Sequence, residues 1–140
     1  MKRRIMMAMF CVGILGGNLS WATDLEFSWQ APPEAREKKN PIPADNVSLQ
    51  RGKPLYDDNC QMCHGDTGKG DGPMADTLTK HPGNLSAKER MDKLTDGELF
   101  WRVSAGDAVM PSFEKDKPLT EQQRWDIINY IRTLASPKGP

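Results

Sequence analysis

The chain has 140 residues and a formal net charge of zero, from 19 Lys and Arg residues and 19 Asp and Glu residues. This balance leaves no basic footprint for nucleic-acid binding and favours docking through local charged patches. Hydrophobic residues make up 37% of the chain, which is low for a domain that builds its core from side chains alone. The length suits one domain with an appendage.

Residues 1–22 have the pattern of a secretory signal peptide. The start is positively charged, residues 5–17 form an apolar stretch, and Ser20 and Ala22 supply the small residues expected before a cleavage site at Thr23. An uncleaved anchor is the alternative, but these 13 apolar residues fall short of the roughly 20 that span a bilayer. The mature chain would be periplasmic, with 16 basic and 19 acidic residues and no transmembrane segment.

Residues 23–45 form an N-terminal arm. Four prolines and a charged run at 34–39, without hydrophobic periodicity, predict an extended and poorly packed segment. Phe27 and Trp29 are the aromatic exceptions. They could fold back on the domain surface, or they could dock on a larger membrane-associated complex.

A helix is expected to begin at Asn46 or Ser48, since either residue can act as an N-cap, and to run toward Cys60. Pro54 would remove one backbone hydrogen bond from it, so a bent or late-starting helix is expected. Gly52 would allow a second helix to cross closely.

The motif Cys60-Gln61-Met62-Cys63-His64 carries the chemistry of the chain. Two cysteines separated by two residues and followed by a histidine are the attachment signature of a c-type haem. Each thiol would form a thioether bond with one vinyl group, and His64 would reach the iron through an imidazole nitrogen. The motif therefore predicts one covalently bound haem c.

Other roles for the two cysteines fit less well. A structural zinc site needs four Cys or His ligands, and beyond the leader the chain offers only Cys60, Cys63, His64 and His81. A thioredoxin-like pair needs a βαβ unit, and no convincing strand pattern lies nearby. A disulfide across so small a loop would give little stabilisation.

The residues after the motif predict a loop and three further helices. The glycine-rich run 65–73 predicts a loop around one haem edge, and a short helix at 74–79 precedes the turn at 81–83. Capping-box patterns begin at Ser86 and Thr95, and the second predicts a helix that ends at Gly106. A third box, at Thr120, begins the strongest predicted helix, residues 121–134. Its apolar stripe is expected to be core and consists of Ile127, Ile128, Ile131, Leu134 and Ala135.

An electron-transfer haem needs a second axial ligand, and Met110 is our candidate. It lies in an irregular loop that Pro111 stiffens, and a thioether ligand raises the reduction potential. His81 is the rival and would give a lower-potential haem. If neither residue ligates, the iron keeps an open site, as in a haem peroxidase or a gas-binding sensor. Met74 and Met91 are expected to be core residues.

Residues 47–134 resemble bacterial class I cytochromes c. The resemblance implies an all-α fold of about four to five short helices around one covalent haem, with the first and last helices crossing beside it. It also implies that the Pro73 carbonyl oxygen accepts a hydrogen bond from the His64 ring. In detail the domain looks like the monohaem subunits of respiratory complexes and dehydrogenases. The matching residues are Gly52, Tyr56, Cys60-Gln61-Met62-Cys63-His64-Gly65, Gly70-Asp71-Gly72-Pro73, Met110-Pro111-Ser112-Phe113 and the segment 125–131.

We therefore expect an exported electron carrier and no enzyme, with a cytochrome domain at residues 46–137 and a short tail at 138–140. Its haem would exchange single electrons with protein partners that dock at the exposed haem edge. It would act as a free carrier or as a subunit of a respiratory or dehydrogenase complex. The lysines that could steer a partner are Lys69, Lys80 and Lys115.

Overall fold

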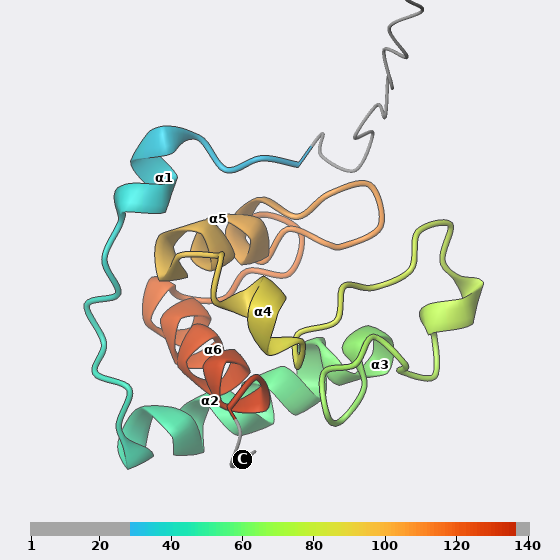
Figure 1. Cartoon of the computed structure of the whole chain (residues 1–140), viewed down its shortest axis with the longest axis horizontal. Coiled ribbons are helices and arrows are strands. Elements are labelled where there is room, and N and C mark those ends of the chain that lie inside the picture. The colour runs from blue at the N-terminus through green and yellow to red at the C-terminus, as the bar shows by residue number, and fades with distance from the viewer. Residues whose placement is uncertain (1–28, 137–140) are drawn as a thin grey trace, which may run out of the picture.

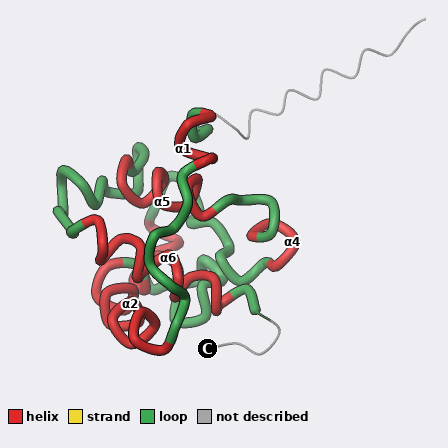
Figure 2. The backbone as a smooth tube through the Cα atoms, turned by 90° about the vertical axis from the view of Figure 1, so that its left-hand side faces the viewer, coloured by secondary structure: helices red, strands yellow, loops and turns green. Residues whose placement is uncertain are grey.

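A computed structural model describes residues 29–136. The predicted signal peptide with its cleavage site, Phe27 and the tail lie outside these residues. Within them the fold is all-α and contains no strand (Figure 2), as predicted. The helices are α1 (Pro33–Glu37), α2 (Asn46–Asn59), α3 (Gln61–His64), α4 (Lys88–Met91), α5 (Asp96–Ala105) and α6 (Glu121–Leu134), with a 3₁₀ turn η1 (Ala75–Thr77) between α3 and α4.

Helices α2 and α6 cross in the lower part of the view in Figure 1 and form the most extensive contact between two helices of the fold. Gly52 of α2 lies directly on the backbone of Asp126, and the rings of Tyr56 and Tyr130 pack with their centroids 5.3 Å apart. The predicted stripe of α6 is buried except for Ala135, which is half-buried. Burial of this apolar surface is the main source of stability at the crossing.

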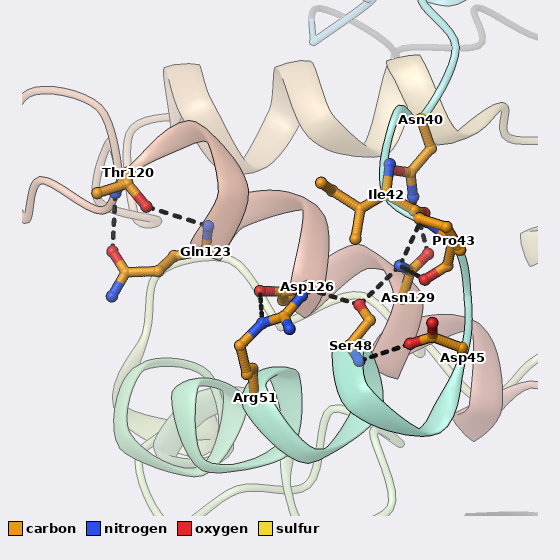
Figure 3. Close-up of polar contacts among 10 residues, drawn as sticks. All are labelled: Asn40, Ile42, Pro43, Asp45, Ser48, Arg51, Thr120, Gln123, Asp126 and Asn129. Carbon is orange, nitrogen blue, oxygen red and sulfur yellow. Dashed lines mark hydrogen bonds and ion pairs between the residues drawn. The ribbon is translucent and has the colours of Figure 1, made fainter.

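A buried polar cluster fixes the register of α2 against α6 (Figure 3). The Asp126 carboxylate is 1% exposed and accepts a hydrogen bond from the Ser48 hydroxyl at 2.6 Å and two from the Arg51 guanidinium at 2.8 Å. Asn129 donates to the Ser48 hydroxyl at 2.8 Å. A buried carboxylate is tolerated only when it is paired in this way, so the two helices have one favourable alignment.

Helix α2 begins earlier than predicted. Its N-cap is Asp45, whose carboxylate accepts a hydrogen bond from the Ser48 backbone N–H at 2.9 Å, so our choice of Asn46 or Ser48 was wrong. The helix also continues through Pro54, which is exposed. Contact with α6 holds the helix together where the proline leaves one carbonyl without its helical partner.

Two of the three predicted capping boxes mark helix starts. Thr95 and Thr120 are the N-caps of α5 and α6, and Gln123 completes the box at Thr120. The prediction at Ser86 was wrong, because the side chain of Asn84 accepts the hydrogen bonds from Ser86 and leaves α4 without a side-chain cap. The helix expected at 74–79 is reduced to the turn η1.

The described part of the arm lies along the domain, and it is extended apart from α1 (Figure 2). At its C-terminal end, Asn129 of α6 accepts a hydrogen bond from Asn40 and donates to the carbonyl oxygens of Ile42 and Pro43 (Figure 3). The tight packing of α1 on α5 was not expected from the prolines and charges of this segment.

The seat of α1 is built around Gly97 of α5. A Cβ on Gly97 would lie 2.1 Å from the Ala35 carbonyl oxygen, and the Thr95 hydroxyl donates to the Arg36 carbonyl oxygen at 2.8 Å. An ion pair of 2.8 Å joins Lys38 to Glu121.

Across residues 29–136 we find no helical segment with the length and hydropathy needed to traverse a bilayer.

Candidate haem site

One cavity of about 490 Å³ brings together four residues that the sequence singled out. Cys60, Cys63, His64 and Met110 all line it, although Met110 lies about 50 positions further along the chain. The volume lies within the range of cofactor pockets in proteins.

The fold of the attachment motif is a single helical turn. The Cys60 carbonyl oxygen accepts hydrogen bonds from the backbone N–H groups of Cys63 at 3.1 Å and His64 at 2.8 Å. Residues separated by three and four positions lie on the same face of a helix, so both thiols and the imidazole are directed to one side. Gly65 then ends α3 with a φ of 77°, a conformation that favours glycine.

The imidazole of His64 is oriented by the Gly83 carbonyl oxygen, which lies 3.0 Å from Nδ1. Because a carbonyl oxygen only accepts hydrogen bonds, Nδ1 carries the proton and Nε2 keeps its lone pair. Burial lowers the pKa of His64, although the hydrogen bond to Gly83 acts in the opposite direction. The ring is therefore neutral near pH 7 and suited to bind a metal ion.

The residue expected to orient His64, Pro73, does not do so in this structure. The backbone N–H of Gly72 donates to Cys63 and that of Met74 to Met62, so this part of the glycine-rich loop runs along the backbone of α3. Pro73 is exposed and does not line the cavity. The sequence shows a turn at 81–83, but it contains no signal that the carbonyl of this turn would face the histidine.

Met110 lies in a loop that Asp107 holds in place. The Asp107 carboxylate accepts hydrogen bonds from the backbone N–H groups of Val109 and Met110, both at 2.9 Å, and the Asp107 N–H donates to the Met110 carbonyl oxygen at 2.8 Å. Desolvation raises the pKa of Asp107, but these two bonds and Lys80 outweigh it and lower the pKa. Gly106, with a φ of 68°, lets the chain turn into this loop.

The remaining candidates divide between the cavity and the surface. His81 also lines the cavity, but it is exposed, and its Nδ1 lies 3.3 Å from the adjacent Pro82 carbonyl oxygen. Met91 is 1% exposed, as expected of a core residue. Met74 is 43% exposed, so its assignment to the core was wrong.

A zinc or dithiol role for the cysteines fits the structure poorly. Burial raises the pKa of the Cys60 thiol to about 12, and a protonated thiol is a weak nucleophile for dithiol exchange. Among the described residues no three His, Cys, Asp or Glu side chains are grouped as metal ligands.

The chemistry of the cavity walls fits a haem. Most of the lining is apolar and would cover the faces of a porphyrin, with residues that include Leu78, Leu85, Leu94, Leu99, Val103 and Phe113. Three cations also line it, Lys80, Arg90 and Arg102, against one carboxylate, that of Asp107. An apolar group that carries carboxylates matches this lining.

A family model for cytochrome c matches residues 49–135. The chain belongs to the cytochrome c family. It is a class I monohaem c-type cytochrome with covalently bound haem c.

The relatives agree with this assignment. A curated protein of Corynebacterium efficiens, a cytochrome bc1 complex cytochrome c subunit, is 27% identical over 99 residues, which are 69% of this chain and 29% of that protein. This chain therefore spans less than a third of the length of that relative.

Two solved structures share the fold. One belongs to the reducing HAO-like protein complex Kustc0457/Kustc0458 of Kuenenia stuttgartiensis, with 25% identity, a TM-score of 0.58, and coverage of 69% of this chain and 47% of that one. The other is the c-type cytochrome KustC0563, with 21% identity, a TM-score of 0.52, and coverage of 61% and 98%. The second likeness concerns the fold alone.

Proposed function

We propose that this cytochrome is exported to the periplasm and passes single electrons between protein partners through a haem c attached to Cys60 and Cys63. His64 and Met110 are its axial ligands. The observation that carries the proposal is the meeting of these four side chains at one cavity. Haem supplies the one-electron change between ferric and ferrous iron when it is bound there.

The surrounding residues favour a rigid ligand set. Gly83 restrains rotation of the His64 ring, and Asp107 fixes the backbone on which Met110 is mounted. The far side of the Met110 loop is fixed to α5, because the Ser112 hydroxyl donates to the Ser104 carbonyl oxygen at 2.6 Å. Axial ligands that keep their positions in both oxidation states suit an electron carrier. They would not suit an enzyme whose iron must open a coordination position for a substrate.

We propose that the partners are proteins of a respiratory chain. The curated relative is named as a subunit of a cytochrome bc1 complex, and one structural relative is part of a multiprotein complex. Lys69, Lys80 and Lys115 are exposed and available for docking, and Lys80 also lines the cavity. Co-purification with a membrane complex would identify the protein as a bound subunit, and purification without one would identify it as a free carrier.

The test is a reductive titration of the full chain after export in a host that attaches haem c. The proposal predicts that the haem stays on the protein in acidic organic solvent, that each chain takes up one electron reversibly, and that added carbon monoxide or cyanide binds slowly. Rapid binding of either ligand would favour the peroxidase or gas-sensor alternative. A colourless protein, or haem that is extracted, would contradict the proposed attachment.

A further inference from the structure

Two exposed methionines lie together at the haem-attachment motif. Met62, inside the motif, is 50% exposed, and Met74 is 43% exposed. The backbone N–H of Met74 donates to the Met62 carbonyl oxygen at 2.9 Å, so both side chains leave the backbone within one small area. Val47, in the first turn of α2, is the other exposed large hydrophobic residue among residues 29–136. Neither methionine lines the haem cavity, so the cofactor pocket does not explain this methionine pair.

The methionine pair stands on a closely packed backbone. Gly72 lies so near α3 that a Cβ on it would be 2.5 Å from the carbonyl oxygens of both Gln61 and Met62. Its N–H donates to the Cys63 carbonyl oxygen at 3.1 Å, and η1, which follows Met74, packs on α3. A backbone that is already ordered loses little conformational entropy when a partner covers it. The methionine side chains themselves are unbranched and polarisable, which suits them to contact with another protein.

Four aspartates flank the methionine pair. Asp66 and Asp71 lie in the glycine-rich loop, where Asp66 accepts a hydrogen bond from Gln61 of α3 and the Asp71 carboxylate lies against the C-terminal end of that helix. Asp76 belongs to η1, and Asp58 lies in the last turn of α2, just before the motif. All four are exposed, and none of them forms an ion pair within residues 29–136. Their charges are therefore available to a partner.

The charge of this surface is opposite to that of the cavity. Lys69 is the one Lys or Arg residue between positions 58 and 76, against the four aspartates. The cavity lining instead has Lys80, Arg90 and Arg102 against one carboxylate. Interfaces between proteins commonly have an apolar centre and a polar rim, and complementary charge at the rim speeds their encounter. A partner that covers the methionine pair therefore fits best when its own rim is basic.

We propose that Met62 and Met74, with the four aspartates around them, form the docking surface for a redox protein whose own contact surface has an apolar centre and a basic rim. The proposal rests on the proposed function, because it takes Cys60 and Cys63 to carry the haem. Met62 lies between these cysteines in the chain, so a partner seated on it is next to the edge at which the haem is attached. One electron passes between the haem and the redox group of the partner, and no atom is transferred.

The test follows oxidation of the reduced, haem-loaded protein by stopped-flow absorbance. The probe is tris(phenanthroline)cobalt(III), a cation with apolar ligands, which takes one electron to become cobalt(II) while the haem iron becomes ferric. Asp66→Asn combined with Asp76→Asn should slow this reaction about two- to fivefold at low ionic strength, and added salt should remove the difference. Glu34→Gln combined with Glu37→Gln is the matched control, because it removes the same charge from exposed positions of α1, which Figure 1 shows apart from α3. Its rate should stay near that of the wild type.

The apolar centre is tested at high ionic strength, where the charges are screened. Met62→Gln combined with Met74→Gln should still slow oxidation by the cobalt complex, whereas Val47→Thr, at the exposed hydrophobic residue outside the methionine pair, should not. Oxidation by ferricyanide, an anion, controls for a change in the haem itself, and its rate should not fall in any of these variants.

Three results would overturn the proposal. They are a wild-type rate with the cobalt complex in either the aspartate or the methionine variant, equal slowing in the Glu34 and Glu37 control or in Val47→Thr, and a parallel fall in the rate with ferricyanide. Absence of covalent haem from the wild type would instead overturn the proposed function.

Discussion

Gly52 and Asp126 are in backbone contact where α2 and α6 cross. A Cβ on Gly52 would lie 2.1 Å from the Asp126 carbonyl oxygen and 2.7 Å from its carbonyl carbon. Neither of these atoms can move without shifting α6. The crossing that supports the haem cavity therefore depends on a residue without a side chain.

Gly52→Ala should lower the free energy of unfolding by about 3 kcal/mol, the upper end of the range for overpacked cores, because the clash is with backbone. Urea unfolding of the oxidised protein, followed by circular dichroism, measures this loss. Gln50→Ala, an exposed change on the same helix, should stay within about 0.5 kcal/mol of the wild type. Equal stability of the two variants would contradict the close crossing.

Ser48→Ala should destabilise the protein by about 1–3 kcal/mol, because it removes one hydrogen-bond donor from the buried Asp126 carboxylate and one of the acceptors of Asn129. The same urea experiment measures the effect. The matched change Ser86→Ala removes a hydrogen bond nearer the surface and should cost less than about 1 kcal/mol. A smaller loss for Ser48→Ala than for Ser86→Ala would speak against the cluster as a source of stability.

Asp107→Ala should loosen the iron–sulfur bond without loss of haem, because the backbone N–H groups of Val109 and Met110 lose their acceptor. We expect a weaker thioether-to-iron absorbance band and faster binding of carbon monoxide to the reduced protein. Asp107→Asn keeps an acceptor oxygen and should retain more of the band. If Asp107→Ala binds carbon monoxide no faster than the wild type, Asp107 does not hold the Met110 loop.

Gly97→Ala should release the arm, because the added methyl group would collide with the carbonyl oxygens of Ala35 and Lys38. Trypsin should then cut faster after Lys38 and Lys39, while the cytochrome domain stays folded. Lys93→Ala, an exposed change just before α5, should leave the rate of cleavage unchanged. A wild-type rate in Gly97→Ala would mean that α1 does not depend on this seat.

Local sequence signals predicted much of this fold. The side chains of Thr95 and Thr120 mark two helix starts, and Gly106 marks a helix end, because each satisfies or permits a backbone geometry within a few residues. The motif around Cys60 likewise encodes its own helical turn. These signals need no knowledge of distant segments.

The sequence-based predictions that were wrong mostly concern contacts between segments that are far apart in the chain. The carbonyl group beside His64 is that of Gly83 and not that of Pro73, and this depends on how the loop folds back on the domain. A backbone carbonyl carries no side-chain signature, so a sequence does not reveal which one will face a histidine. The start of α2 failed for a different reason, since Asp45, Asn46 and Ser48 are all good N-cap residues and tertiary packing chose among them.

The most direct test of the axial ligands is the long-wavelength absorbance of the oxidised protein, with Met110→Leu measured beside the wild type. A methionine sulfur on ferric iron gives a weak charge-transfer band in this region. We predict the band in the wild type and its loss in Met110→Leu at equal haem content. A wild type without the band, or a variant that keeps it, would contradict the assignment of Met110 as the second ligand.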